Sequence, residues 1–264
     1  MHLFDQDISL IRKAALVFKG NVSSNWSVNG TPNGGYLMAM LTNAMVKCSD
    51  KKETPIITAN YISRSVPGEA DIFVEKFAQS TQFTRLQARL VQGGMERIRI
   101  IGTFADEKNE CFMKRYEASP PDMHSPEECI EIPSVPDLTI LDNMEIRLDP
   151  ECAGWMSGSL SKRSELKGWI RHRKKRKFDL FSILSCTDSF PPPIMASQGM
   201  LSWVPTIELS INVRNIPETT WLKCIFRTRF INCGLLEEDG EVWDENGRLV
   251  SISRQIAQFR TTGA

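Results

Sequence analysis

The chain has 264 residues, of which 41% are hydrophobic and 24% are charged, so it can bury one large core or two cores of about 120 residues each. Its 32 lysines and arginines equal its 32 aspartates and glutamates. The chain therefore has no net positive charge that would attract nucleic acid or an anionic membrane. The seven cysteines are scattered and form no CxxC pair, which indicates buried thiols in a reducing compartment rather than a disulfide framework or a zinc site.

The beginning of the sequence predicts no targeting segment. Residues 1–10 carry acids and lack a basic stretch followed by a long apolar core, so we expect no secretory signal. No apolar run approaches the roughly 18 residues of a membrane-spanning helix. We therefore expect a cytoplasmic protein without membrane insertion.

The first half of the chain is predicted to form a strand, a buried helix and an antiparallel sheet. Ala14 to Trp26 can form the first strand, and residues 29–35, which are rich in glycine, asparagine and proline, predict a turn. A helix should follow and end at 50–53, because apolar residues recur at i, i+4, i+7 and i+8: Leu37, Leu41, Ala44 and Met45. Short turns separate the strands expected next, so they should pair as hairpins with the helix on one face: Ile56 to Arg64, Asp71 to Gln79, Thr84 to Gln92 and Glu96 to Ala105.

The second half repeats this order after a linker. Ser119 to Pro136 contains five prolines and no periodicity, which is typical of a connection between units. Leu138 to Leu148 and Trp169 to Arg173 are strand-like, and a helix from Phe178 to Ser189 is stopped by prolines. The remaining strands are predicted at Thr206 to Val213, Trp221 to Phe230, Leu235 to Trp243 and Leu249 to Phe259.

Segments 55–67 and 205–217 also resemble each other residue by residue. Six positions match at a spacing of about 150 residues: Pro55, Ile57, Ala59, Tyr61, Arg64 and Pro67 with Pro205, Ile207, Leu209, Ile211, Arg214 and Pro217. The prediction is an α+β protein made of two units, 1–118 and 137–264, joined by the linker 119–136. Each sheet would wrap its own helix, and the two sheets would pack together as a fused pseudo-dimer with a site between the copies.

Missing motifs exclude several kinds of active site. The chain has no GxSxG, GxGxxG or phosphate-loop motif. Its three histidines are His2, His124 in the linker and His172 in a basic run, which disfavours Ser-His-Asp, Cys-His and metal sites. We therefore expect no metal and no cofactor.

Asp188 is a candidate catalytic base. It follows Leu184 by four residues and Leu180 by eight, so on a helix it shares the apolar stripe. Burial would raise the pKa of its carboxyl, and a carboxylate beside polar partners is a reasonable general base. The alternative is a residue of the last helical turn that has frayed into solvent.

Two polar residues of the predicted strands are further candidates. Gln255 shares a strand face with the small residues Ser251, Ser253 and Ala257, which leaves room for an amide that positions a water; the alternative is a solvent-facing glutamine. Alternation places Thr206 with Glu208, Ser210 and Asn212, on the face that the pattern predicts to be exposed.

Two segments could bind an anionic ligand. Asn33, Gly34 and Gly35 precede the first helix, where open backbone N–H groups can meet an anion or an oxyanion; an ordinary helix start capped by Asn33 is the alternative. Residues 171–177 include six lysines and arginines. They could meet nucleotide phosphates or form a solvated edge that discourages strand pairing.

The order of these elements resembles the double-hotdog acyl-CoA thioesterases of the thioesterase II type, over nearly the whole chain. The most specific features are the segments 188–192, 205–209 and 244–255. The resemblance implies two tandem hotdog units, each an antiparallel sheet wrapping a long helix. It also implies a role in lipid metabolism, with acyl-CoA as the substrate.

The resemblance further implies that Asp188, Thr206 and Gln255 hold the hydrolytic water, and that a backbone N–H near Gly35 or from the second helix stabilises the oxyanion. The family often has histidine or phenylalanine where this chain has Asn33. Two alternatives stay open: a non-catalytic acyl-chain or acyl-CoA binding protein of the same fold, and a dehydratase or hydratase, whose usual helix histidine is missing. Sheet edges also leave homo-oligomers open.

Overall fold

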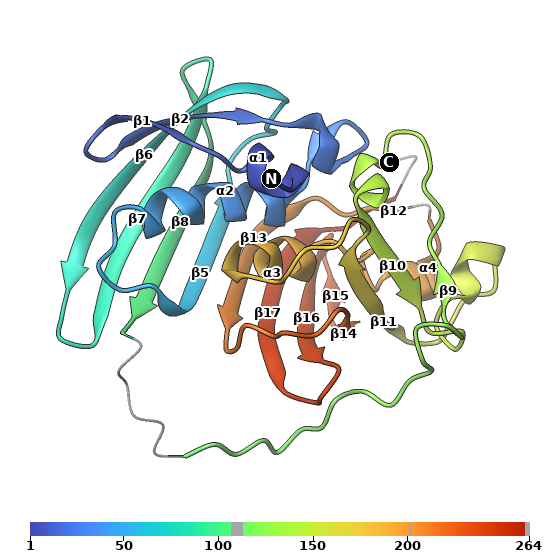
Figure 1. Cartoon of the computed structure of the whole chain (residues 1–264). Coiled ribbons are helices and arrows are strands. Elements are labelled where there is room, and N and C mark those ends of the chain that lie inside the picture. Colours follow the sequence, from blue (N-terminus) through green and yellow to red (C-terminus); the bar gives the residue numbers. More distant parts are fainter. Residues whose placement is uncertain (107–112, 201, 262–264) are drawn as a thin grey trace.

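The computed structural model describes residues 1–106, 113–200 and 202–261 (Figure 1). Its first half contains α1 (Leu3–Asp7), β1 (Ile11–Ala14), β2 (Val17–Val22), β3 (Ser27–Val28), β4 (Thr31–Pro32), α2 (Gly34–Val46), β5 (Glu53–Tyr61), β6 (Gly68–Gln79), β7 (Phe83–Gln92) and β8 (Met95–Ala105). Its second half contains β9 (Ile130–Glu131), β10 (Met144–Leu148), β11 (Ser164–His172), α3 (Leu180–Thr187), α4 (Met195–Gln198), β12 (Ser202–Trp203), β13 (Thr206–Val213), β14 (Leu222–Thr228), β15 (Ile231–Asn232), β16 (Leu235–Asp244), β17 (Leu249–Gln258) and β18 (Arg260–Thr261).

These elements form two copies of one motif, which confirms the α+β double-hotdog prediction. In each copy, antiparallel strands curve around a helix, α2 in the first and α3 in the second (Figure 1). The prediction of two separate sheets is wrong. Strands β5 and β13 pair antiparallel, so both halves belong to one 14-stranded sheet. The edge strands of the two copies satisfy each other's backbone groups, and this removes two exposed edges.

The repeat is real, but its register differs from the sequence match by two residues. In the first copy the N–H groups of Ile62 and Ser63 both donate to the Arg97 carbonyl, and in the second copy those of Arg214 and Asn215 both donate to Val250. Ile62 is therefore the counterpart of Arg214. At this spacing Thr58 is the counterpart of Ser210, and their hydroxyls lie 3.0 Å apart across the β5–β13 junction, 152 residues apart in sequence. Two residues are one full strand period, so the in/out assignments are unchanged.

Several element boundaries also differ from those predicted. The first strand is split into β1 and β2 and followed by a 3-10 turn at Ser24–Trp26. The segment 138–148 begins as a 3-10 turn, Thr139–Asp142, and only β10 is a strand. Within the segment predicted as the linker, β9 pairs with β10. The helix α2 ends at Val46, before the predicted stop.

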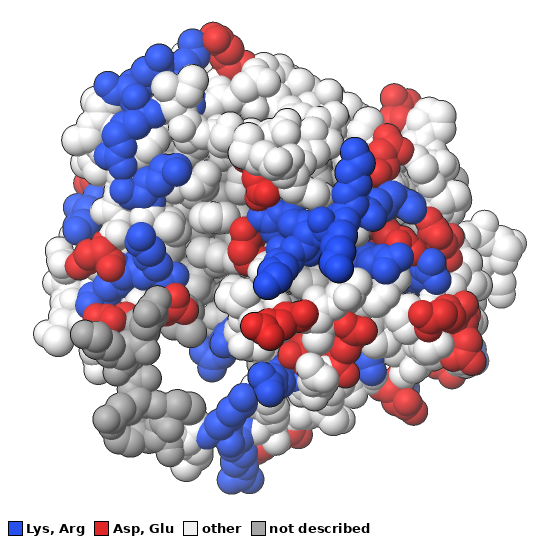
Figure 2. All heavy atoms as spheres, viewed as in Figure 1, with Lys and Arg blue, Asp and Glu red and all other residues white. Residues whose placement is uncertain are grey.

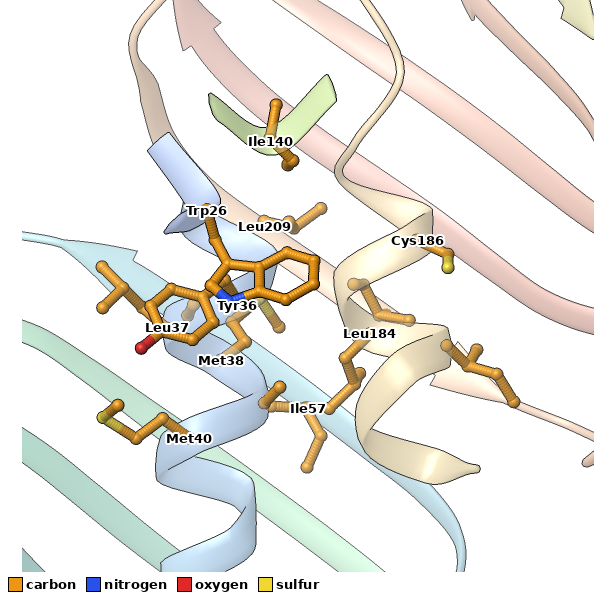
Figure 3. Close-up of a cluster of buried hydrophobic side chains, with 14 of the residues drawn as sticks. Trp26, Tyr36, Leu37, Met38, Met40, Ile57, Ile140, Leu184, Cys186 and Leu209 are labelled. Carbon is orange, nitrogen blue, oxygen red and sulfur yellow. The ribbon is translucent and has the colours of Figure 1, made fainter. Parts of the chain in front are cut away.

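The two helices lie against each other between the arms of the curved sheet, and their contact is the centre of the core (Figures 1 and 3). The sequence predicted one apolar stripe on α2, but Tyr36 through Leu41 are six consecutive residues that are at most 2% exposed. A helix that is apolar all round is buried on every side. Here the sheet, α3 and the Trp26 ring, which stacks on Tyr36 at 6.1 Å, cover it.

His172 ends β11 inside this core. It is 4% exposed, and neither ring nitrogen has a partner among the described residues. The rings of His2, Phe4 and Trp26 lie 5.2, 5.4 and 6.1 Å from it. Burial, followed by the nearby positive charge of Arg176, lowers the pKa of His172 to about 3. The imidazole is therefore neutral in the folded protein, whereas in the unfolded chain it binds a proton below pH 6.5.

We predict that His172→Phe reduces the acid sensitivity of the fold. Between pH 6.5 and 3 the unfolded state holds a proton on His172 that the folded state rejects, so stability falls as pH falls through this window. Relative to the variant, the wild type should lose about 1.5 kcal/mol between pH 6.5 and 5. Urea unfolding of both proteins at the two pH values measures this, and equal losses would contradict it.

Candidate active site

The end of α3 and the start of α2 meet at Asp188. Asp188 is half-buried and follows the last residue of α3. Its Oδ2 accepts hydrogen bonds from the Gly35 backbone N–H at 2.7 Å and the Asn33 Nδ2 at 3.1 Å. Asn33 Nδ2 also donates to the Asp188 carbonyl at 2.8 Å. The carboxylate is therefore held by the first copy and is not frayed into solvent.

Local sequence determines where both helices begin and end. Asn33 caps α2 by accepting the Tyr36 N–H at 2.9 Å through Oδ1, so its amide serves both helices. Asp179 and Ser182 form a capping box at the start of α3. The prolines at 191–193 prevent the helix from continuing past Asp188.

The two glycines allow the helices to approach this closely. A Cβ at Gly35 would lie 2.6 Å from the Leu184 carbonyl oxygen and 2.7 Å from the Asp188 Cβ. At Gly34 it would lie 2.5 Å from the Tyr61 hydroxyl and 2.9 Å from Asp188 Oδ2. Any larger residue would separate the carboxylate from the donors of α2.

The site favours a carboxyl that changes charge near neutral pH. Burial raises the pKa of Asp188 to about 6, against the Gly35 N–H and the Asn33 amide, which stabilise the anion and lower it. Oδ1 accepts no hydrogen bond within the described part of the chain, and it is not fully sealed from solvent. The carboxylate thus has one oxygen anchored on α2 and one available to a water molecule.

Gln255 lies on the core face of β17 and is 6% exposed, so the solvent-facing alternative is wrong. Thr206 lies on the same face, which the alternation pattern did not predict. A bulge in β13 between Thr206 and Glu208 places Thr206 opposite Ala257, a fully buried residue. Since paired residues of an antiparallel sheet point to the same side, the extra residue turns Thr206 inward.

Two residues that we did not single out as candidates complete this wall. Glu238 on β16 lies directly opposite Gln255, which in turn lies opposite Leu209 on β13. Burial, followed by the charge of Asp188, raises the pKa of Glu238 to about 8. Alternation with the buried Leu236 and Val242 is the signal that would have placed Glu238 inward.

The second overlooked residue is Tyr61, at the end of β5. It shares the core face with Ile57 and Ala59, both fully buried, and its hydroxyl is a buried atom without a hydrogen-bond partner in the described chain. The side chains of Thr206, Gln255 and Glu238 likewise make no hydrogen bond to described residues. Four polar groups on the core face of the sheet thus make no hydrogen bond to described residues. The charge of Asp188 acts on two of them, Tyr61 and Glu238.

The basic run lies at the other end of α3. Figure 2 shows lysine and arginine gathered on the face where the loop before α3 runs in Figure 1. Its arginines are engaged: Arg176 with Asp5 and Asp179, Arg171 with Glu145 and Arg173 with Glu131. The start of α3 is about 12 Å from its end, so this run does not contact Asp188.

The described residues offer neither a metal site nor a membrane-spanning helix. No group of three or more histidine, cysteine, aspartate or glutamate side chains there could hold a metal ion. Within the same residues, no helix combines the length and apolarity that crossing a membrane requires.

Two domain models of known proteins match this chain, one in each copy of the fold. Residues 22–105 match the model of the acyl-CoA thioesterase N-terminal domain, and residues 126–259 match that of the acyl-CoA thioesterase C-terminal domain. An uncharacterized protein of Mycobacterium tuberculosis is 20% identical over 92% of this chain and 91% of its own length.

Solved structures show the same fold. A proposed thioesterase II from Thermobifida fusca YX superposes with a TM-score of 0.90 at 24% identity, covering 98% of both chains. A hot dog protein of unknown function from Alicyclobacillus acidocaldarius gives 0.90 at 18% identity and 99% coverage of both chains. The acyl-CoA thioesterase II TesB2 of Mycobacterium marinum gives 0.78 at 14% identity, covering 98% of this chain and 99% of its own.

We predict that Gly35→Ala destabilises the contact between the helices. The new methyl group would overlap the Leu184 carbonyl and Asp188, and backbone atoms cannot give way as a flexible side chain can. The free energy of unfolding should fall by about 1–3 kcal/mol, measured by urea denaturation. A variant as stable as the wild type would show that this contact is not close-packed.

Proposed function

The chain belongs to the acyl-CoA thioesterase family, and from this premise we propose that it hydrolyses acyl-CoA to the free acid and coenzyme A, with Asp188 as the general base. The observation that supports this most is the half-buried Asp188 carboxylate, anchored through Oδ2 and open at Oδ1. A base whose pKa is about 6 is ionised at neutral pH and still accepts a proton from water readily.

Thr206 and Gln255 would orient the water. Both face inward on neighbouring strands, with one residue pair between them, and neither side chain is engaged by a described residue. A hydroxyl and an amide can each donate and accept a hydrogen bond, so together they can aim a water between Asp188 and a carbonyl carbon. The water gives a proton to Asp188 and its oxygen attacks that carbon.

The leaving group makes few demands on the site. When the carbon–sulfur bond breaks, coenzyme A leaves as a thiolate, whose conjugate acid has a pKa of about 8.5. A thiolate of this kind leaves without a strong general acid. A site without histidine is sufficient for this chemistry.

The first copy would supply donors rather than a second site. Gln255 pairs with Leu209, and the counterpart of Leu209 is Ile57, which pairs with Gly102. Glycine cannot replace the amide of Gln255. We therefore propose one active site per chain, to which the first copy contributes Asn33, Gly34 and Gly35.

A panel of acyl-CoAs from short to long chains tests the proposal through release of free coenzyme A. We expect hydrolysis by the wild type and a loss of about 10²- to 10⁴-fold in kcat for Asp188→Asn. Asp71→Asn, which changes an exposed aspartate of β6, should leave the rate unchanged. If no acyl-CoA is hydrolysed, the non-catalytic binding protein becomes the better description.

We also predict a bell-shaped dependence of kcat/KM on pH. Below about pH 6 activity should fall tenfold per pH unit, because protonated Asp188 cannot accept a proton. Above about pH 8 ionised Glu238 adds a second negative charge that opposes the developing oxyanion. Glu238→Gln should remove the alkaline limb and keep the acid limb. An unchanged alkaline limb in this variant would assign it to another group.

A further inference from the structure

The proposed hydrolysis needs donors for the oxyanion, and one of the expected backbone N–H groups near Gly35 is already engaged. The Gly35 N–H donates to Asp188 at 2.7 Å, so it holds the base instead of facing the substrate. The other expected source, an N–H of α3, is at the start of that helix, about 12 Å from Asp188. A side chain beside Asp188 could supply a further donor to the carbonyl oxygen.

The Tyr61 hydroxyl lies beside the proposed base, Asp188. It is buried and has no partner among the described residues. It lies 2.5 Å from the point where a Gly34 Cβ would be, and Asp188 Oδ2 lies 2.9 Å from the same point. The hydroxyl and the base therefore both lie against Gly34 at the start of α2. A buried hydroxyl without a partner is costly to retain, which is typical of a group that a ligand satisfies.

The strand register places Tyr61 beside the water-binding residues. On β5, Asn60 pairs with Glu208 of β13, so Tyr61 is next to the bulge that turns Thr206 inward. Tyr61 thus borders the site on the side of the first copy, and Gln255 borders it on the side of the second copy. A carbonyl attacked by water held at Thr206 and Gln255 would present its oxygen toward Tyr61.

We propose that the Tyr61 hydroxyl donates a hydrogen bond to the thioester carbonyl oxygen and stabilises the oxyanion formed when water attacks. The proton of the water goes to Asp188, the carbon–sulfur bond breaks, and Tyr61 keeps its own proton throughout. Burial, and then the charge of Asp188, raise the pKa of Tyr61 well above its ordinary value, so the hydroxyl remains a donor. This inference rests on the proposed hydrolysis.

Tyr61→Phe tests it, because the variant keeps the ring and removes one oxygen atom that has no protein partner among the described residues. With the acyl-CoA that the wild type prefers, kcat should fall about 10²- to 10³-fold with little change in KM. The acid limb of the pH profile should stay near pH 6. A hydroxyl that acted only by stabilising the Asp188 anion would, when removed, shift this limb to higher pH.

Tyr36→Phe is the matched control. Its hydroxyl is also buried in the core, but it bonds Asp7 and Ser23 away from Asp188, so kcat should be unchanged. Wild-type kcat in Tyr61→Phe, or a displaced acid limb, would overturn the inference while leaving the hydrolysis intact. If the wild type hydrolysed no acyl-CoA, both the proposed hydrolysis and the role of Tyr61 would be overturned. Urea unfolding of each variant shows whether a lost rate reflects a lost fold.

Discussion

The contact between Asp188 and the first turn of α2 is the constraint on which the rest of the structure depends. A half-buried carboxylate is unfavourable unless donors compensate for lost water, and here both donors come from the other copy of the fold. The start of α2 must therefore pack closely against the end of α3, which requires glycine at 34 and 35. The continuous sheet satisfies this requirement, because the β5–β13 pairing fixes how one copy lies against the other.

Fusion of the two copies in one chain allows them to diverge. A symmetric dimer would carry two equal sites, but here the position of Gln255 in the second copy is occupied by Gly102 in the first. In the site that we propose, the first copy supplies a helix terminus and the Tyr61 hydroxyl, and the second supplies the carboxyl, hydroxyl and amide groups. Each copy is thus free to specialise in one half of the reaction that we propose.

The polar wall of the site combines groups with opposite tendencies. Asp188 is stabilised as an anion by α2 and has a pKa of about 6, whereas Glu238 receives no such donor from the described residues and has a pKa of about 8. At neutral pH this favours one charged and one neutral carboxyl in the same space. Two carboxyls whose pKa values differ in this way can take different roles, one as an anion and the other as a neutral acid.

The sequence by itself determined the elements: the order of strands and helices, the duplication, and the candidates Asp188 and Gln255, because hydrophobic period and turn residues act locally. Its alternation pattern placed Thr206 outward, against the role that the family resemblance implied, since a single inserted residue in β13 reverses the alternation. The sequence did not reveal Glu238 and Tyr61 as neighbours of Asp188, or the partners of Gly35. Those depend on which strands pair and how closely two helices approach, and only tertiary packing decides between residues that are more than 100 positions apart.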